Sequence, residues 1–417
     1  MKTVSIDSPE FLASAAKPRR LDKLARRLFR SRLERLARGR IIIHDGGAKS
    51  VYGLRNEDWP LEAVVHVHDP RFYSDLVFGG SIGSGEAYMQ GHWTCDDLST
   101  LVRILLSNRK VLEHVDSGAS SLARPARKLL HWLNRNTRKG SRRNIAAHYD
   151  LGNDFYALWL DSRMMYSSAY FESPQARLEE AAAAKLDMIC RKLDLQPDDR
   201  LLEIGSGWGG FAIFAAQNYG CHVTTTTISR EQYALAEARI REAGLEDRIT
   251  LLAEDYRDLA GRYDKLVSIE MIEAVGHQFH TTFFQKCCEL LEPHGKLLLQ
   301  AITIADQRFD AYKKDVDFIR RYIFPGGCLT SVTDMCGILT EHTDMRVLDL
   351  EDIGPHYSRT LRAWRERFFA AIDEVRDLGY PEPFIRMWEY YLCFCEGAFE
   401  ERAIGDVQML IARPDAR

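Results

Sequence analysis

The stretch "LLEIGSGWGG", Leu201 to Gly210, decides the fold of this 417-residue chain. Its apolar start predicts a buried strand, and Gly205, Gly207 and Gly210 place the pattern G-x-G-x-x-G in the turn that follows. Further strand patterns ("HVTTTTI", "ITLLAED", "YDKLVSIEM", "KLLLQAITI") then alternate with helical ones, and "GDVQMLIARP" predicts a closing strand. This alternation predicts an α/β fold with a doubly wound, Rossmann-like parallel sheet from about residue 145 onward.

The residues around the glycine-rich turn indicate which nucleotide it meets. A dinucleotide site needs an acid about 20 residues further on, at the end of the second strand, but that strand ends in "TTTTIS". Glu203 instead completes the pattern apolar-Glu-apolar-Gly-x-Gly, which resembles the first motif of S-adenosylmethionine (SAM) methyltransferases. SAM has no pyrophosphate, so its loop needs close backbone approach, and the charge of Glu203 suits the methionyl ammonium. The sequence therefore favours SAM over NAD and over a turn without a ligand.

Three other acidic or histidine positions are candidate ligands. Asp255 lies in "AEDYRDL" after the third predicted strand, where an acid in SAM enzymes commonly meets the adenine amino group; a helix cap is the alternative. His66 and His68 would share one strand face, but no third metal ligand is evident, so no metal site is predicted. None of the nine cysteines forms a C-x-x-C pair, which favours reduced thiols in a cytosolic protein.

Charge divides the chain. Residues 1–150 carry a formal charge of +10 and residues 151–417 one of −14, so the first part is expected to meet an anionic surface. In "KPRRLDKLARRLFRSRLERLARGR" (17–40) arginines surround one helical face, near which fall Leu21, Leu24, Leu28, Leu33 and Leu36. This pattern predicts docking on an anionic membrane, with packing on its own domain as an equal alternative. Nucleic acid is disfavoured because few aromatic residues alternate with the arginines.

The sequence predicts three segments. They are a smaller mixed α/β domain for lipid and membrane docking (1–125), a basic linker (126–144) and a catalytic domain (145–417). No apolar run approaches the roughly 20 residues of a membrane span, and the N-terminus lacks the order of a secretory signal. We therefore expect a cytoplasmic protein, associated peripherally with the inner face of the membrane. Whether it forms a homodimer stays open.

Five motifs in one order carry a resemblance to a known family. They are "GEAYMQGHW" (85–93), "AAHYDLGNDFYALWLDSRMMYSSAYF" (146–171), "LLEIGSGWGG" (201–210), "EMIEAVG" (270–276) and "RYIFPGGCL" (321–329). Over about residues 60–410 the chain resembles cyclopropane-fatty-acyl-phospholipid synthases. The resemblance implies SAM-dependent transfer of a methylene group to the cis double bond of unsaturated phospholipid acyl chains, which forms a cyclopropane. It also implies a bound bicarbonate ion as the base that removes the proton released on ring closure.

Site residues follow from the same resemblance. Around the cofactor it assigns Tyr166 and Ser167 to the wall of the SAM site, Gly205 and Gly207 to the loop, and Thr227, Ile228 and Gln232 to the flanks of the ribose and adenine. In the bicarbonate pocket it assigns Glu273, Tyr357 and the backbone of Ile302. Apart from the resemblance, Glu273 reads as a helix-start acid and Tyr357 as an ordinary, partly buried tyrosine.

The chain departs from the family pattern at three positions of that pocket. Ser168 stands where the best-known members have cysteine, and Gln300 and Ala274 stand where they have histidine. Serine and glutamine can still donate hydrogen bonds to an anion, so Ser168 and Gln300 are kept as catalytic candidates. Neither Gln300 nor Ala274 can titrate near neutral pH as a histidine can. An anion could be held, but the disposal of the proton is expected to differ.

These departures keep other functions open. The near alternative is C-methylation of the same double bond without ring closure, giving a methylene or, after a separate reduction, a methyl branch. A membrane-binding protein with a vestigial SAM fold and a small-molecule methyltransferase are weaker alternatives. The aromatic residues of "AWRERFF" and "MWEYYLCF" sit at helical spacing, which favours core packing over the lining of an acyl channel.

Overall fold

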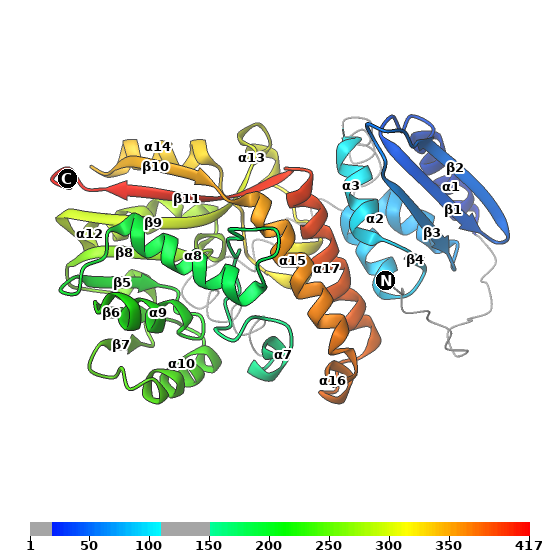
Figure 1. Ribbon diagram of the computed structural model, residues 1–417. Helices are drawn as coiled ribbons and strands as arrows, with labels where there is room; N and C mark the ends of the chain where they lie inside the picture. Colours follow the sequence, from blue (N-terminus) through cyan, green and yellow to red (C-terminus); the bar gives the residue numbers. More distant parts are fainter. Residues whose placement is uncertain (1–18, 110–150) are drawn as a thin grey trace.

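The computed structural model describes residues 19–109 and 151–417, drawn in colour in Figure 1. We refer to these two ranges as the N-terminal unit and the C-terminal unit. Each unit contains its own sheet, of four strands in the first and seven in the second. The predicted linker (126–144) lies outside the described residues.

A seven-stranded sheet forms the centre of the C-terminal unit, in the order β10-β11-β9-β8-β5-β6-β7. Its strands are β5 (Arg200–Ile204), β6 (His222–Thr226), β7 (Ile249–Leu252), β8 (Tyr263–Ile269), β9 (Leu291–Ile304), β10 (Arg346–Asp352) and β11 (Ile404–Ala412). Neighbours from β7 to β9 pair in parallel, whereas β11 is antiparallel to both β9 and β10. The predicted doubly wound sheet is confirmed, and its predicted closing strand, β11, runs against the others.

Helices cover both faces of this sheet because successive strand residues point to opposite sides. Leu201 packs with α8 (Leu178–Leu193), α9 (Gly210–Tyr219) and α10 (Arg230–Glu242). Its neighbour Leu202 packs with α12 (His280–Leu290) and α14 (Val332–His342) on the other face. The C-terminal unit also contains the short segments α11 (Ile272–Val275), η3 (Tyr256–Asp258), η4 (His277–Phe279), α13 (Asp306–Tyr312) and the π-helical turn η5 (Ile319–Ile323).

The glycine-rich stretch that opened the sequence analysis joins β5 to α9. Gly205 has φ +102° and Gly207 has φ +49°, backbone conformations that residues with a side chain rarely adopt. Between these glycines and α9 lies Trp208, whose Nε1 donates a 2.7 Å hydrogen bond to Asn153 Oδ1. The Trp208 ring also packs on Tyr156, with 5.1 Å between the centroids. The hydrogen bond and the ring packing of Trp208 thus hold the glycine-rich loop in place.

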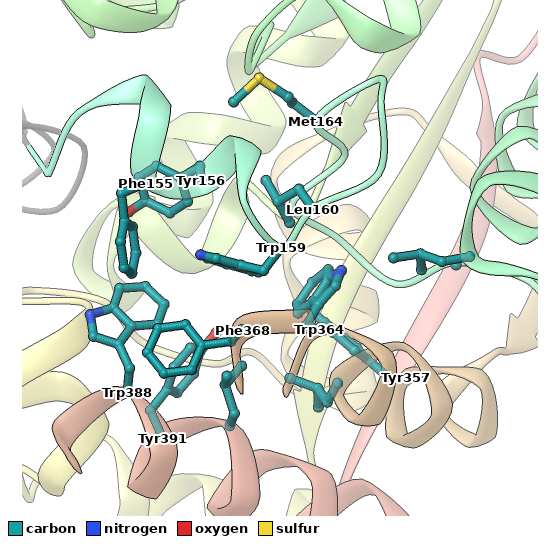
Figure 2. Packing of buried hydrophobic residues seen from close by; sticks show 14 of the residues in the cluster. Phe155, Tyr156, Trp159, Leu160, Met164, Tyr357, Trp364, Phe368, Trp388 and Tyr391 are labelled. Atoms are coloured by element: carbon teal, nitrogen blue, oxygen red, sulfur yellow. The ribbon is translucent and has the colours of Figure 1, made fainter. Parts of the chain in front are cut away.

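An aromatic cluster fills the space between the sheet and two helices, α15 (Gly354–Ala370) and α17 (Glu382–Glu400). The short helix α16 (Ile372–Asp377) lies between these two helices in the chain. Figure 2 shows Trp364 and Phe368 from α15 and Trp388 from α17 meeting Phe155 and Trp159 near α7 (Asn153–Ala157). Trp159 lies 5.6 Å from Trp364 and 5.5 Å from Trp388 between ring centroids. For the residues in this cluster, the prediction that the aromatic motifs pack in the protein core is confirmed.

The N-terminal unit is a small mixed α/β unit, as predicted. Its elements are α1 (Arg20–Leu33), β1 (Gly39–Asp45), β2 (Ala48–Leu54), β3 (Glu62–Val67), α2 (Arg71–Met89), β4 (Trp93–Cys95) and α3 (Leu98–Ser107). The sheet order is β2-β1-β3-β4, with β1 and β3 parallel. No helix within the described ranges combines the length and the apolar character that a bilayer crossing requires.

The predicted basic helix exists, but its leucines do not share one environment. Leu33, the last residue of α1, and Leu36 beyond it are buried in the core of the N-terminal unit. Leu21, Leu24 and Leu28 are 48%, 52% and 42% exposed. Packing on its own domain therefore describes the C-terminal end of the predicted helix. At its N-terminal end Leu21, Leu24 and Leu28 form an apolar row on the surface.

Helix α17 holds the two units together. Figure 1 shows it between the seven-stranded sheet and helices α2 and α3. Tyr390 and Cys393 of α17 belong to the apolar core of the N-terminal unit. The Tyr88 hydroxyl donates a 2.7 Å hydrogen bond to Glu389 Oε2, and Ser99 Oγ donates one of 3.0 Å to Glu396 Oε2.

Candidate active site

A cavity of about 360 Å³ opens at the ends of strands β5, β6 and β8, where the glycine-rich loop begins. The nine predicted cofactor residues all line it: Tyr166, Ser167, Glu203, Gly205, Gly207, Thr227, Ile228, Gln232 and Asp255. A Cβ placed on Gly207 would meet no protein atom within 4 Å, so that side of the loop faces open space. The shape fits a ligand that approaches the backbone closely, as SAM requires.

Glu203 gives the cofactor side of the cavity its charge. Its carboxyl group is buried and accepts a 2.5 Å hydrogen bond from Thr225 Oγ1. Burial raises the pKa of Glu203 to about 7, opposed by that hydrogen bond and by the charge of Lys185. A cationic group beside Glu203 would favour its ionised form. The residue thus suits the ammonium that the sequence assigned to it.

The helix-cap alternative for Asp255 is what the local structure shows. Its side chain accepts from the backbone N–H of Arg257 at the start of η3. Both carboxylate oxygens also accept from the Arg257 guanidinium, at 2.7 and 2.6 Å. Asp255 still lines the cavity, and its contact with adenine stays a prediction.

A carboxylate that sequence reasoning missed lies at the deep end of the cavity. Glu270 follows β8 directly and has φ +48°. Its Oε1 accepts from the Ser168 backbone N–H and from Gln300 Nε2, each at 2.8 Å. Its Oε2 accepts from the Tyr357 hydroxyl at 2.6 Å. The signal was present in the motif "EMIEAVG", whose first letter is this glutamate at the end of a predicted strand.

Ser168 and Gln300 are therefore placed differently from the expectation. Both are fully buried and neither lines the cavity. The Ser168 hydroxyl donates to the carbonyl of Ala169 at 3.0 Å. Gln300 divides its amide N–H groups between Glu270 and Asp406 Oδ2, the latter at 3.1 Å. They contact Glu270 rather than the open space, because its carboxylate lies between them and the cavity.

Glu273, Tyr357 and Ile302 do line the cavity, as expected. Glu273 Oε1 accepts from the Ile302 backbone N–H at 2.5 Å, and its buried Oε2 has no hydrogen-bond partner. Burial, and then the charge of Glu270, raise the pKa of Glu273 to about 8. Ala274 also faces the cavity and adds no polar group.

The site does not fit bicarbonate in the manner that the resemblance implies. The donors assigned to that ion are the Ile302 N–H, the Tyr357 hydroxyl and groups of Ser168 and Gln300. The Ile302 N–H, the Tyr357 hydroxyl, the Ser168 N–H and Gln300 Nε2 already serve a carboxylate of the chain, either Glu273 or Glu270, and the Ser168 hydroxyl donates to the Ala169 carbonyl.

One buried cation faces this group of acids. Lys185 of α8 is fully buried, and its Nζ donates a 2.8 Å hydrogen bond to Ser167 Oγ. Burial lowers the pKa of Lys185 to about 8, while Glu270, Asp161 and Asp406 raise it. Asp406 of β11 is also buried, and burial followed by the charges of Glu270 and Glu273 holds its pKa well above the usual range. A lysine in the apolar run "EEAAAAKLDM" was the sequence signal for this group.

No group of three or more histidine, cysteine or acidic side chains within the described ranges is arranged to hold a metal ion. His66 and His68 stack on one another along β3, with 6.5 Å between ring centroids, and His44 stacks on His66 from the next strand.

The fold and the loop define a class of protein. A doubly wound sheet, a glycine-rich turn after its central strand and an acid on that strand form the site of a SAM-dependent methyltransferase. Two solved structures are similar to this chain. The cyclopropane synthase MmaA2 from Mycobacterium tuberculosis is 31% identical, with a TM-score of 0.61, over 65% of this chain and 98% of that one. Mycolic acid cyclopropane synthase CmaA1, complexed with SAH and CTAB, is 30% identical with the same TM-score and the same shares.

The chain belongs to the family described as mycolic acid cyclopropane synthetase, whose model matches residues 136–409. It is 40% identical to the cyclopropane-fatty-acyl-phospholipid synthase of Escherichia coli K12 over 84% of this chain and 88% of that protein. It is 36% identical to the tuberculostearic acid methyltransferase UfaA1 of Mycobacterium tuberculosis, over 99% of this chain and 97% of that protein. The predicted family is confirmed.

The loop assignment predicts that Gly207→Val abolishes SAM binding. The valine side chain would enter the open space beside the loop and would strain a backbone at positive φ. Calorimetry with SAM measures the effect. Gly46→Val is the matched control, because Gly46 also has positive φ and open space but lies in a hairpin turn of the N-terminal unit. Equal SAM affinity in both variants would show that the loop does not bind the cofactor.

SAM affinity is expected to rise with pH. With pKa values of about 7 and about 8, Glu203 and Glu273 are largely protonated in mildly acidic solution. A cationic ligand binds more tightly to their ionised forms, so the logarithm of the association constant should rise from about pH 6 and level off above about pH 8, where both groups are ionised. The rise is at most about one log unit per pH unit for each group.

Calorimetry at several pH values checks this profile. Glu203→Gln should weaken SAM binding and flatten the rise with pH. Glu389→Gln removes a buried carboxyl group that does not line the cavity and should leave the profile unchanged. A pH-independent affinity in the wild-type protein would contradict the placement of the SAM cation beside these acids.

Proposed function

We propose that the protein transfers a methylene group from SAM to the cis double bond of unsaturated acyl chains in phospholipids and closes a cyclopropane ring. The observation that supports this most directly is one cavity shared by the glycine loop, the buried acids and an apolar wall. That wall includes Ile319, Phe324, Leu361, Phe394 and Phe399, and its apolar surface suits a hydrocarbon chain.

The chemistry needs a dry site because an alkene is a weak nucleophile. When bound, SAM supplies an electrophilic methyl group; attack by the double bond forms a carbon–carbon bond, breaks the carbon–sulfur bond and leaves a cationic acyl carbon. The aromatic cluster and α17 exclude water from this side of the cavity. Buried carboxylates at the deep end place negative charge where the cation develops, and such charge acts strongly in a low-dielectric site.

C-methylation without ring closure is the second candidate. Both reactions share the cationic acyl carbon and the loss of a proton from the transferred methyl group, and they differ in whether a hydride first moves from the methylated carbon to the cationic carbon. One observation favours the alternative: similarity to a protein described as a tuberculostearic acid methyltransferase extends over 99% of this chain. The exchange of the expected pocket histidines for Gln300 and Ala274 points the same way.

Expression in a host that lacks such an enzyme tests the function. Mass spectrometry of fatty acid methyl esters should show products one methylene heavier than the unsaturated precursors. A saturated methyl branch is heavier than the ring by two hydrogens, and NMR separates the ring from an isomeric methylene branch. The Gly207→Val variant, expressed in parallel, should give none of these products. Unchanged fatty acids with the wild-type protein would overturn both candidates.

The second part of our proposal is that the N-terminal unit docks the enzyme on anionic membranes. The exposed face of α1 carries Leu21, Leu24 and Leu28. Exposed cations stand among them: Arg20, Lys23 and Arg27. Leu106 of α3 lines the same cavity as the glycine loop, so the N-terminal unit also reaches the site itself. Its apolar and basic surface would bring the enzyme to substrate that stays in the bilayer, at its cytoplasmic face.

Not every arginine of α1 is available for lipid. Arg26 lies 2.6 Å and Arg30 3.7 Å from Asp45 Oδ2, and the Arg26 guanidinium stands over the Tyr73 ring. Those two residues join α1 to the rest of its unit. The cations to remove are therefore the three exposed ones.

Replacing Arg20, Lys23 and Arg27 by glutamine should weaken binding to anionic vesicles. Each basic residue near such a surface contributes about 1 kcal/mol, so the loss is expected to be about a hundredfold. Vesicle sedimentation measures it, and wild-type binding should fall with added salt. The matched control changes Arg191, Arg230 and Arg241, exposed on α8 and α10 of the C-terminal unit. Equal loss in both triple variants would mean that net charge, and not α1, directs binding.

A further inference from the structure

Glu270 occupies the centre of the group of residues that was expected to hold an anion. Three of those residues direct a donor to its carboxylate: the Ser168 N–H, Gln300 Nε2 and the Tyr357 hydroxyl. They come from a loop before α8, from β9 and from α15, so the convergence is built by the tertiary fold. The chain thus supplies a carboxylate where the resemblance implies a separate anion.

The backbone at Glu270 has an unusual conformation. Glu270 is one of only a few residues with a side chain at positive φ in the described ranges, and such a conformation costs about 1–2 kcal/mol. Its backbone N–H donates to the Gln300 carbonyl at 2.8 Å, which fixes the turn after β8. A strained, buried acid is retained in a structure only when surrounding contacts compensate for it.

The carboxylate keeps capacity to accept a proton. Oε1 accepts two hydrogen bonds and Oε2 accepts one, from Tyr357, and an ionised carboxylate oxygen can accept two. The Glu270 carboxyl group also shares a hydrogen bond with the carboxyl group of Asp406. Glu270 lines the cavity together with Glu273. Burial raises the pKa of Glu270, and the hydrogen bonds from Tyr357, Ser168 and Gln300 and the charge of Lys185 oppose that rise. A base whose pKa lies nearer to neutrality is suited to accept a proton and release it again.

We propose that Glu270 is the internal base of the reaction, taking the place of a bound bicarbonate ion. The inference rests on the proposed transfer to an acyl double bond. After the new carbon–carbon bond has formed, one C–H bond of the transferred methyl group breaks and its proton goes to Glu270 Oε2. In ring closure the electron pair forms the bond between the methyl carbon and the cationic carbon. In formation of a methylene branch a hydride first moves from the methylated carbon to the cationic carbon, and the electron pair then forms the new double bond. Tyr357 positions that oxygen and stays protonated in the resting site.

The experiment compares two changes at this residue. Glu270→Gln keeps the size of the side chain but removes the base, and turnover should fall at least about a hundredfold. Glu270→Gly empties the space and frees the donors of Ser168, Gln300 and Tyr357. Turnover of the glycine variant should fall similarly and then be restored in part by added bicarbonate or formate, whereas the glutamine variant should not respond. Wild-type turnover should be the same in carbonate-free and bicarbonate-containing buffer.

A binding measurement separates this inference from the proposed function. Calorimetry should detect bicarbonate binding to Glu270→Gly and none to the wild-type protein, whether or not a lipid product has been found. SAM affinity checks that the variants are folded, and Glu389→Gln serves as control because Glu389 is also a buried glutamate that accepts from a tyrosine. Bicarbonate stimulation of the wild-type enzyme, or near-normal turnover of Glu270→Gln, would overturn the inference. An inactive wild-type enzyme with the expected anion binding would instead count against the proposed function.

Discussion

The burial of several carboxyl groups around one lysine is the constraint on which the site depends. Glu203 and Asp406 are buried, and Glu270 and Glu273 are partly buried at the deep end of the cavity. Lys185 is the buried cation that acts on Glu203, Glu270 and Asp406. Taking an ion out of water costs several kcal/mol unless partners replace its hydration. Each acid accepts at least one hydrogen bond, and burial still raises its pKa. Glu270 is the acid with the largest number of donors.

The sheet topology explains why these groups meet. Strands β5, β8 and β9 are parallel neighbours, so residues after β5 and β8 reach the same edge. Strand β11 enters antiparallel beside β9 and brings Asp406 opposite Ile302. Ligands of open α/β sheets bind at this carboxyl edge. A methyl donor and a hydrocarbon chain can share one cavity there because α15 and α17 cover it with aromatic side chains.

Local signals predicted the cofactor side of the site well and the deep end less well. Strand period, glycine spacing and the patterns around Glu203 and Asp255 depend on neighbouring residues. The other five cofactor residues, namely Tyr166, Ser167, Thr227, Ile228 and Gln232, came from the family resemblance, and the structure places all nine around one cavity. Ser168 and Gln300 were expected to face an open pocket. Whether they do depends on Glu270, which is remote from both in sequence and turns inward only because of its positive φ. The helix over 17–40 shows the same limit: periodicity placed its leucines on one face, but the end of α1 at Leu33 divided them between core and surface.

The contact between the two units would connect the proposed membrane docking with the chemistry of the site. Helix α17 contributes Tyr391 and Phe394 to the cavity wall and Tyr390 to the core of the N-terminal unit. A change in the packing of that unit against α17 would therefore shift side chains in the cavity wall beside the buried acids. The solved structures of MmaA2 and CmaA1 cover 65% of this chain, and they match nearly their whole length, so the additional unit is a feature that this chain does not share with them. An enzyme whose substrate lies in a bilayer needs a surface that meets lipid and a site that excludes water. In the proposed function helix α17 would connect the two, because its side chains contribute both to the core of the N-terminal unit and to the wall of the cavity.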